Sequence, residues 1–454
     1  MRQAQATRTC TSSAPILLVV CLLQSMVALG VDYAQKGDEY VQQEFDAGRF
    51  VGSVMVARSN RIVFMKGYGL ANREHNIPNA PDTKFRLASL TKQFTAMCIL
   101  HLQEQGKLSI DDCVCRFVPG CPSNWSGVKI RHLLGHTSGI TNFTDFPDYA
   151  SKMMLSSPPE KTIQRFRDAP LGFEPGKRFA YSNSGYILLG YIVERASGRS
   201  YEQYVEETIF KPLGMEGSGY DHFETILPHR AAGYSRRGDT WVNSAYIDMS
   251  IPYGAGGLYS TVEDFFRWYQ CWRERKILSA SSWTEMTTAG EWNYGFGMWI
   301  SEHFRRTTQK VFEHGGHVSG FATSMKWFPD ADLFVAAFAN WDSARTGEIA
   351  ENLAAIMFDM PVTLPKERKA TGEQSVPTPP NHRSQWPPRA RPLCIPRPLL
   401  GATAAEHWAA LNTSHQQQLH ENIVHSITGL SISHDISRRL SELIPPATIQ
   451  TKRL

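Results

Sequence analysis

The strongest constraint on the fold is that strand-like runs lie at both ends of one long region of the chain. Two N-terminal runs, "GSVMVARSN" and "RIVFMKGYG", meet at Ser59–Asn60 and predict a hairpin. Four later runs, rich in aromatic and β-branched residues, predict consecutive antiparallel strands: "YGFGMWI", "KVFEHGG", "FATSMKWFP" and "DLFVAAFAN". We therefore expect one sheet assembled from both ends, with a largely helical insertion of long loops at about 110–290.

Apolar periodicity predicts three helices around this sheet. Residues 31–49 and 343–358 form the first and the last of them. The stretch "FRLASLTKQFTAMCIL", 85–100, opens the third helix, which Gly106 is placed to end. Its apolar residues fall on one stripe, made of Leu90, Phe94, Met97, Cys98 and Leu102.

The two ends of the chain differ from this region in composition. Arg2 and Arg8 precede a short apolar stretch, which predicts that residues 1–30 are a signal peptide and that the protein is secreted or periplasmic. An uncleaved anchor is the alternative reading. Ten of the 26 prolines fall between 361 and 398, so we expect 361–454 to be a linker and a disordered tail. The region between these two ends, 38–360, is then expected to form one folded domain.

The charge distribution excludes one class of partner. The net charge is +4, but residues 361–454 hold eleven Lys/Arg and six Asp/Glu. The remaining 36 basic and 37 acidic residues nearly cancel, so the body of the protein carries no excess of positive charge for nucleic acid. Beyond the N-terminal stretch no segment is apolar and long enough to predict a membrane span.

Three cysteines, Cys113, Cys115 and Cys121, lie in one loop, "DDCVCRFVPGCPSNW". Export permits disulfides, so we expect a local bridge there, with its pairing left open. A metal site would need a fourth ligand and a tighter pattern. Cys98 is expected to be a plain buried thiol.

Ser89 and Lys92 raise the first question of function. Residues three apart on a helix face the same way, so the amine can reach the hydroxyl. A serine becomes a good nucleophile only when a base accepts its proton, and a helix N-terminus stabilises a developing oxyanion. This S-x-x-K pattern is short, and on its own it fits an N-terminal serine and a solvated lysine better than a catalytic pair.

Two further stretches carry polar groups at the ends of predicted elements. In "EPGKRFAYSNSGYILLGYIVE" a turn leads to Tyr181 and Asn183 before an apolar helix. A phenol beside a cationic lysine can be held partly as phenolate and act as a base. In "VFEHGGHVSGF" a strand enters His314, and the two glycines after it let a ligand approach the backbone. The structural alternatives are that Tyr181 is a half-buried loop tyrosine and that His314 is an exposed residue of a tight turn.

Taken in order, "SLTK", "YSN" and "HGG" resemble the motifs of one family, the serine β-lactamases and penicillin-binding DD-peptidases. The histidine of the third motif makes the chain most similar to the D-Ala-D-Ala carboxypeptidase and esterase branch. The resemblance implies an α+β fold, in which helices flank a central antiparallel sheet beside an all-α lobe. It also implies an acyl-enzyme on Ser89, with proton transfer shared between Lys92 and Tyr181, and no metal or cofactor.

The same resemblance implies a substrate-binding side. Asn183 would orient the substrate amide, and His314 would bind the leaving side or relay a proton. Gly315 and Gly316 would admit the substrate to the backbone. The N–H of His317 would complete an oxyanion hole with that of the nucleophilic serine.

The third motif departs from the lysine of the true lactamases. A histidine is largely neutral at pH 7 and holds a substrate carboxylate less firmly. We therefore expect an ester or a D-amino-acid-containing peptide as the substrate, with a true β-lactamase as the alternative. A non-catalytic member that binds peptidoglycan or self-assembles is the second alternative. The oligomeric state is left open, and the only expected partner is a small-molecule or peptide substrate.

Two other pairs of residues have the spacing of a functional site. His132 and His136 have the i, i+4 spacing of a zinc helix, but Leu133 stands where the catalytic glutamate would be. Thr261 and Asp264 fit a helix cap better than a catalytic pair. We expect both pairs to be structural.

Overall fold

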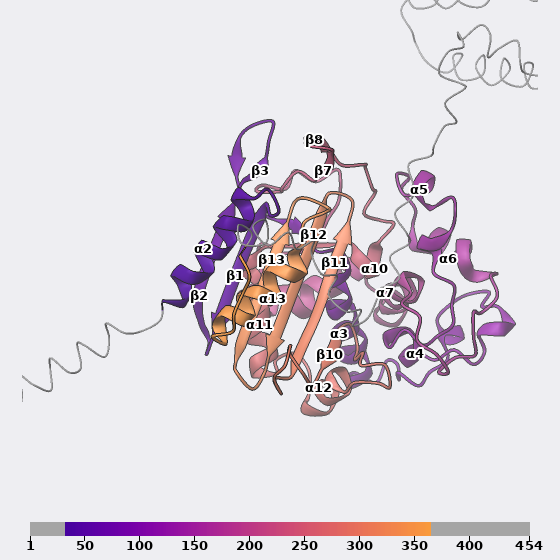
Figure 1. The fold of residues 1–454 in the computed structure, drawn as a ribbon. Coiled ribbons are helices and arrows are strands. Elements are labelled where there is room, and N and C mark those ends of the chain that lie inside the picture. Colours follow the sequence, from indigo (N-terminus) through magenta and orange to yellow (C-terminus); the bar gives the residue numbers. More distant parts are fainter. Residues whose placement is uncertain (1–31, 365–454) are drawn as a thin grey trace, which may run out of the picture. The chain divides into compact units, whose positions relative to one another are not determined.

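The computed structural model describes residues 32–364. The predicted signal peptide, 1–30, lies outside the described residues, as does nearly all of the predicted linker and tail, 361–454. In the described part, a large sheet is covered by helices and stands beside a mainly helical lobe (Figure 1). This is the α+β architecture expected from the sequence.

The central sheet joins the two ends of the described chain. Its six strands have the order β10-β11-β12-β13-β1-β2, and every neighbouring pair is antiparallel. They are β1 (Gly52–Arg58), β2 (Arg61–Tyr68), β10 (Trp299–Ser301), β11 (Val311–Val318), β12 (Phe321–Phe328) and β13 (Leu333–Ala339). Gly52 pairs with Ala339, so the N-terminal hairpin adds to the C-terminal strands as predicted.

Two turns beside the strands of the central sheet have left-handed backbone conformations. Ser59 and Asn60 turn the β1–β2 hairpin with φ of 50° and 60°, a left-handed pair typical of tight hairpins. The run predicted as a strand from Tyr294 becomes regular only at β10. Gly297 has a φ of 86°, and a Cβ there would lie 2.7 Å from Cα of Gln93. The run before β10 is thus a turn pressed against a helix, which the strand prediction missed.

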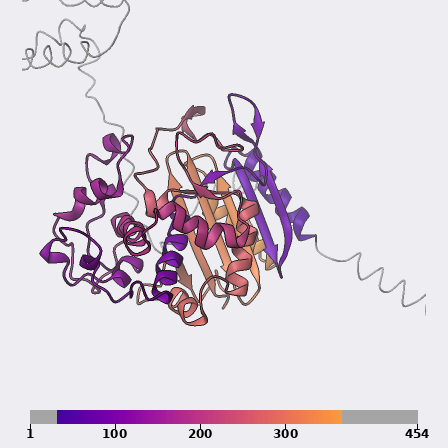
Figure 2. The same ribbon diagram turned by 180° about the vertical axis from the view of Figure 1, so that it is seen from behind.

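Helices pack on both faces of the sheet. On one face lie α2 (Tyr33–Asp46) and α13 (Thr346–Met357), close to the predicted first and last helices. On the other face α11 (Val262–Glu274) packs against β1 and β13 (Figure 2). The Oγ1 of Thr261 accepts the N–H of Asp264 at 2.9 Å, which confirms this pair as a helix cap.

The helix that follows Ser89, α3 (Thr91–Glu104), differs from its prediction. Its predicted apolar stripe is buried, but so are the polar positions Thr91, Lys92, Gln93 and Thr95. The helix has neighbours on all sides, since α7 (Asn183–Ser197), α10 (Tyr253–Gly256) and α12 (Ala280–Thr287) all pack against it. A helix without a solvent face can hold a polar group only where another polar group meets it.

The segment between the two parts of the sheet is mostly helical, as predicted. Its remaining helices are short: η1 (Ala88–Leu90), η2 (Val114–Arg116), η3 (Ser123–Trp125), α4 (Ile130–Leu134), η4 (Phe143–Asp145), α5 (Tyr149–Lys152), α6 (Pro159–Arg167), α8 (Tyr201–Val205), the π-helical η5 (Glu206–Phe210) and α9 (Lys211–Leu213). It also contains small strands that the prediction missed: β6 (Gly219–Tyr220), β7 (Tyr234–Arg237), β8 (Thr240–Asn243) and β9 (Leu258–Ser260). Before it come β3 (Leu70–Asn72), β4 (Ile77–Pro78) and β5 (Phe85–Arg86). Strands this short have too little periodicity to be recognised in a sequence.

Among the helices of residues 32–364, none combines the length and the apolar composition that a bilayer-crossing segment requires.

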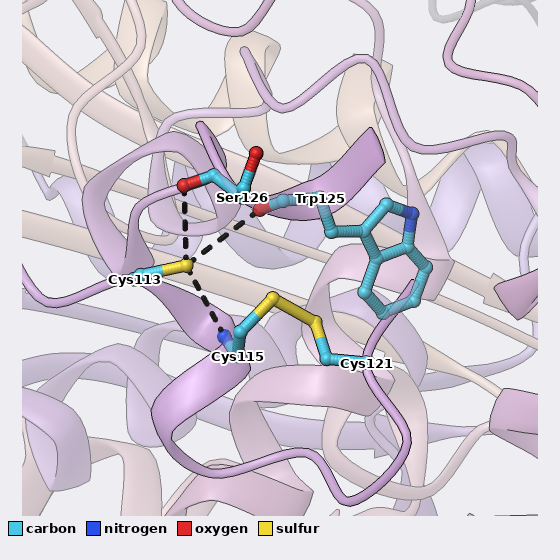
Figure 3. The surroundings of a disulfide bond; sticks show 5 residues. All are labelled: Cys113, Cys115, Cys121, Trp125 and Ser126. Carbon is cyan, nitrogen blue, oxygen red and sulfur yellow. Dashed lines mark hydrogen bonds between the residues drawn. A yellow bond between two sulfur atoms is a disulfide. The ribbon is translucent and has the colours of Figure 1, made fainter. Parts of the chain in front are cut away.

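A disulfide closes the cysteine loop of the helical lobe. Cys115 and Cys121 are bonded, with their Cα atoms 5.2 Å apart (Figure 3). Cys113 keeps a free thiol, whose sulfur accepts the N–H of Cys115 at 3.4 Å. The expected local bridge is thus present, and Cys98 is a buried free thiol as predicted.

Replacing both bonded cysteines, Cys115→Ser with Cys121→Ser, should lower the free energy of unfolding. Freeing a loop of this length enlarges the conformational freedom of the unfolded chain and costs about 2 kcal/mol. Urea denaturation followed by tryptophan fluorescence measures the change. Cys113→Ser is the matched control, since it removes a sulfur without opening a bridge. Equal stability of the double variant and the parent would contradict a stabilising role for the disulfide.

Candidate functional site

Ser89 lies at a strained turn between a strand and a buried helix. β5 ends at Arg86, and the chain turns through η1 into α3. Ala88 has a φ of 49°, a left-handed conformation that costs a non-glycine residue on the order of 1 kcal/mol or more. Leu87 holds this turn in place, because its N–H donates to the carbonyl of Leu258 at 2.8 Å. Ser89 itself is half-buried, so its hydroxyl remains open to a ligand.

Lys92 is fully buried and is held by three oxygen atoms. Its Nζ lies 2.9 Å from Oγ of Ser89, 2.9 Å from Oδ1 of Asn183 and 2.8 Å from the carbonyl oxygen of Ala255. Within residues 32–364 no carboxylate forms an ion pair with this amine, and burial lowers the pKa of Lys92 well below its ordinary value. A neutral amine can donate its two N–H groups to Asn183 and Ala255, which leaves its lone pair toward Ser89.

Tyr181 lies on the other side of this amine. The Nζ of Lys92 is 4.9 Å from the centre of its ring. Burial raises the pKa of Tyr181, and a hydrogen bond with Ser89 only partly opposes that rise. The prediction that a cationic lysine would hold this phenol partly as phenolate is therefore not supported, because both groups are pushed toward their neutral forms.

His136 fixes the segment that carries Tyr181. Its carbonyl accepts the N–H of Ala180 at 2.9 Å, and its Nδ1 accepts the N–H of Ser182 at 3.1 Å. Its ring lies 4.3 Å from that of Tyr181, measured between centroids. His136 follows the end of α4 with a φ of 57°, so it does not continue the helix of His132. His136 thus has a structural role beside the site, because it holds the segment that carries Tyr181.

Asn183 is the first residue of α7 and is fixed from two sides. Its Oδ1 accepts from Lys92, and its backbone N–H donates to Oδ1 of Asn142 at 3.0 Å. Asn142 in turn donates its side-chain N–H groups to Thr144 at 2.7 Å and Asp145 at 3.0 Å. This network of side chains orients the Asn183 amide.

The edge of β11 faces the nucleophile. β10 covers only Val311–Glu313 of that edge, and the rest of β11 packs against η1. A Cβ on Gly316 would lie 2.2 Å from the carbonyl oxygen of Leu87 and 3.1 Å from the backbone N of Ser89. Only glycine permits this approach, which brings the backbone of His317, the next residue, close to Ser89.

His314 is buried at the start of this open edge. Its Nδ1 donates to the carbonyl of Gly315 at 2.6 Å, so its Nε2 accepts the hydroxyl of Tyr294 at 3.1 Å. Burial, and then the nearby Lys92, lower the pKa of His314 to about 3. The ring is thus neutral across the physiological range, in agreement with the weak grip on a carboxylate expected from the sequence.

The structure therefore brings together all eight predicted site residues. They are Ser89, Lys92, Tyr181, Asn183, His314, Gly315, Gly316 and His317. Sequence reasoning missed His136, Tyr294, Asn142 and the carbonyl of Ala255. Of these only His136 had a signal, its pairing with His132, and that pattern pointed to another chemistry. In residues 32–364 no three His, Cys, Asp or Glu side chains gather as they would around a metal ion.

A hydroxyl, a buried amine and a backbone edge in this arrangement define a serine hydrolase. The family model described as Beta-lactamase matches residues 38–356, and the chain belongs to that family.

Similar proteins agree with this assignment. A penicillin-binding protein of Bacillus subtilis (strain 168) is 30% identical over 70% of this chain and 74% of its own length. The octameric penicillin-binding protein homologue from Pyrococcus abyssi is 30% identical, with a TM-score of 0.65 over 74% of this chain and 80% of its own. The penicillin-binding protein from Bacillus halodurans is also 30% identical, with a TM-score of 0.63 over 71% and 99%.

The close approach at Gly316 gives a test of the site. Gly316→Ala should lower kcat/KM for a p-nitrophenyl ester by about 100-fold or more, because the new methyl group pushes β11 away from Ser89. Gly347→Ala, in α13, is the matched control, since its Cβ would have no atom within 4 Å. Thermal melting of both variants checks the fold. Equal activities would show that the edge of β11 does not take part.

Proposed function

We propose that the protein is an exported serine hydrolase that forms an acyl-enzyme on Ser89. Its substrate is an ester or a peptide that contains a D-amino acid. The observation that carries the proposal is the setting of Lys92, a buried amine whose two other partners are pure acceptors. Because these two acceptors satisfy both N–H groups of a neutral amine, its lone pair can take the proton of Ser89.

In the first step the Oγ of Ser89 attacks the substrate carbonyl carbon while its proton passes to Nζ of Lys92. Burial supports Lys92 as the base for this step, because its lowered pKa favours the neutral amine with a free lone pair. Burial keeps Tyr181 in its neutral form, so its hydroxyl has a proton to pass to the leaving group, and the ammonium of Lys92 then returns one to it. Water then attacks the acyl carbon while giving one proton to Lys92, and Lys92 returns that proton to Oγ of Ser89 as the acyl bond breaks.

Two backbone N–H groups would stabilise the oxyanion of both steps. They belong to Ser89, at the start of a buried helix, and to His317, on the open edge of β11. The fit of Gly316 against the backbone of Ser89 supports this pairing. Asn183 would hold the substrate amide with a side-chain N–H, since its Nδ2 carries two hydrogens and donates one to Oγ1 of Thr144 at 3.4 Å.

The substrate class rests on two observations. The relatives at 30% identity are named as penicillin-binding proteins, which supports a D-amino-acid-containing peptide. The third motif offers the neutral ring of His314 in place of a lysine, which argues against a site built to hold the carboxylate of a β-lactam. Uncharged esters need no such anchor and fit the same site.

Export is supported by the chemistry of one loop. The Cys115–Cys121 bridge lies in the body of the protein, and disulfides persist in oxidising compartments. Together with the predicted signal peptide at 1–30, this supports a secreted or periplasmic protein.

The proposal is tested by labelling and by paired variants. A fluorophosphonate should modify Ser89, and Ser89→Ala should abolish the labelling; mass spectrometry locates the adduct. Lys92→Met removes the base at similar volume and should lower kcat by about 100- to 10,000-fold. Tyr181→Phe should cost less, and the double variant should be little worse than Lys92→Met alone.

Two outcomes would contradict this account. An adduct on another serine would end the proposed mechanism. Losses from Lys92→Met and Tyr181→Phe that multiply in the double variant would show two independent groups rather than one proton-transfer unit. A panel of p-nitrophenyl esters, D-Ala-D-Ala peptides and nitrocefin, assayed with the same proteins, separates the substrate classes.

A further inference from the structure

A second pocket lies at the carboxyl end of α7, away from Ser89. Its volume is about 380 Å³, at the lower end of the range of ligand sites. Glu194 of α7 lines it, whereas Asn183 at the other end of α7 belongs to the hydrolytic site. Eleven residues of helix separate the two, or about 16 Å along the axis. The pocket is therefore a site of its own.

The walls of this pocket are strongly acidic. Five carboxylates line it, with no lysine or arginine among the lining residues: Glu194, Glu202, Asp221, Glu224 and Asp248. Arg86 and Arg230 neutralise Asp221 from outside the pocket, at 2.6 and 3.6 Å. His222 pairs with Glu202 at 2.7 Å.

Three of these carboxylates have no such compensation. Glu194, Glu224 and Asp248 form no ion pair with any basic residue of the described chain. Glu194 accepts the N–H of Tyr201 at 2.9 Å, which fixes its position without cancelling its charge. The carboxyl end of α7, with its partial negative charge, adds to the same field. The pocket thus attracts positive charge.

Aromatic rings complete the walls. The rings of Tyr220 and Tyr253 lie 6.4 Å apart, and that of His222 lies 4.9 Å from Tyr220. Phe223, which also lines the pocket, is 67% exposed. Aromatic faces beside carboxylates recognise organic cations, because each ring presents a negative face while the apolar walls shield the charge from water.

Tyr253 supplies an independent sign of a ligand. Its side chain is only 6% exposed and lines the pocket, yet its hydroxyl forms no hydrogen bond of ordinary geometry in the described chain, although the carboxylate of Glu194 is its neighbour. A buried hydroxyl without a partner is destabilising. Burial, and then the carboxylate of Glu194, raise the pKa of Tyr253, so the phenol stays neutral and its oxygen can accept a hydrogen bond.

We propose that this pocket binds a primary ammonium group. Such a group brings a positive charge for Glu194 and Asp248, N–H donors for the hydroxyl of Tyr253, and an alkyl chain for the aromatic walls. The pocket suits an organic cation better than a metal ion, because no three of its carboxylate or imidazole side chains converge as metal ligands do. The ammonium group can come from a free alkylamine or from a lysine side chain of a peptide.

The probes are n-butylammonium, Nα-acetyl-lysine amide and the neutral n-butanol, titrated against the full chain by saturation-transfer difference NMR. Both cations should bind saturably, and n-butanol should bind about tenfold more weakly or not at all. Glu194→Gln keeps the acceptor for Tyr201 but removes the charge, and should weaken cation binding about tenfold. Glu216→Gln is the matched control, since it removes an exposed carboxylate outside the pocket and should change nothing.

Thermal melting verifies that both variants fold. Tyr253→Phe gives a second reading, since it removes only the hydroxyl and should weaken both cations. Tighter binding of the lysine amide identifies a peptide as the source of the ammonium group, and equal or tighter binding of n-butylammonium identifies a free amine. Binding of n-butanol as tight as that of n-butylammonium, or unchanged affinity in Glu194→Gln, would overturn the proposal.

Discussion

The burial of one amine, that of Lys92, is the constraint on which the rest of the site depends. An ammonium ion at this place would lose its hydration without gaining a counter-ion, so the protein favours the neutral base. The three oxygen partners come from η1, α7 and α10, and each of these elements packs against α3. The geometry of proton transfer is thus a product of helix packing.

The second constraint on the site is the unpaired edge of β11, which begins where β10 ends. β10 is so short that it leaves most of one edge of β11 unpaired, and η1 lies along that edge, whereas β12 pairs with the other edge. Thr323 of β12 secures the contact, because its Oγ1 donates to the carbonyl of Leu87 at 2.8 Å. The nucleophile, the strained Ala88 and the open strand edge are therefore held together by few and specific contacts. Such strain is maintained only where the surroundings determine the backbone fully.

The features that the sequence predicted are those marked by a repeating apolar pattern or by a fixed spacing of residues. Alternating runs at both ends of the domain predicted the sheet and its assembly, and the spacing of Ser89 and Lys92 predicted their contact. The polar positions of α3, such as Thr95, could not be recognised as buried. Thr95 donates to the carbonyl of Gly254, which lies far along the chain. His136 and Tyr294 escaped for the same reason, since their roles depend on contacts with residues 180–182 and 314. Periodicity reports which side of an element is apolar, but not which distant polar group will meet it.

Activation of Ser89 by Lys92 requires Lys92 to be a neutral amine in the folded protein. NMR of the lysine Cε methylene groups, followed as a function of pH with Lys92→Met to assign the signal, measures its pKa directly. Lys92 should titrate well below the ordinary pKa of 10.5, and its titration should be separate from that of the exposed lysines. A Lys92 signal that titrates with the exposed lysines or above them would show a buried ammonium ion, and would contradict its role as the base that activates Ser89.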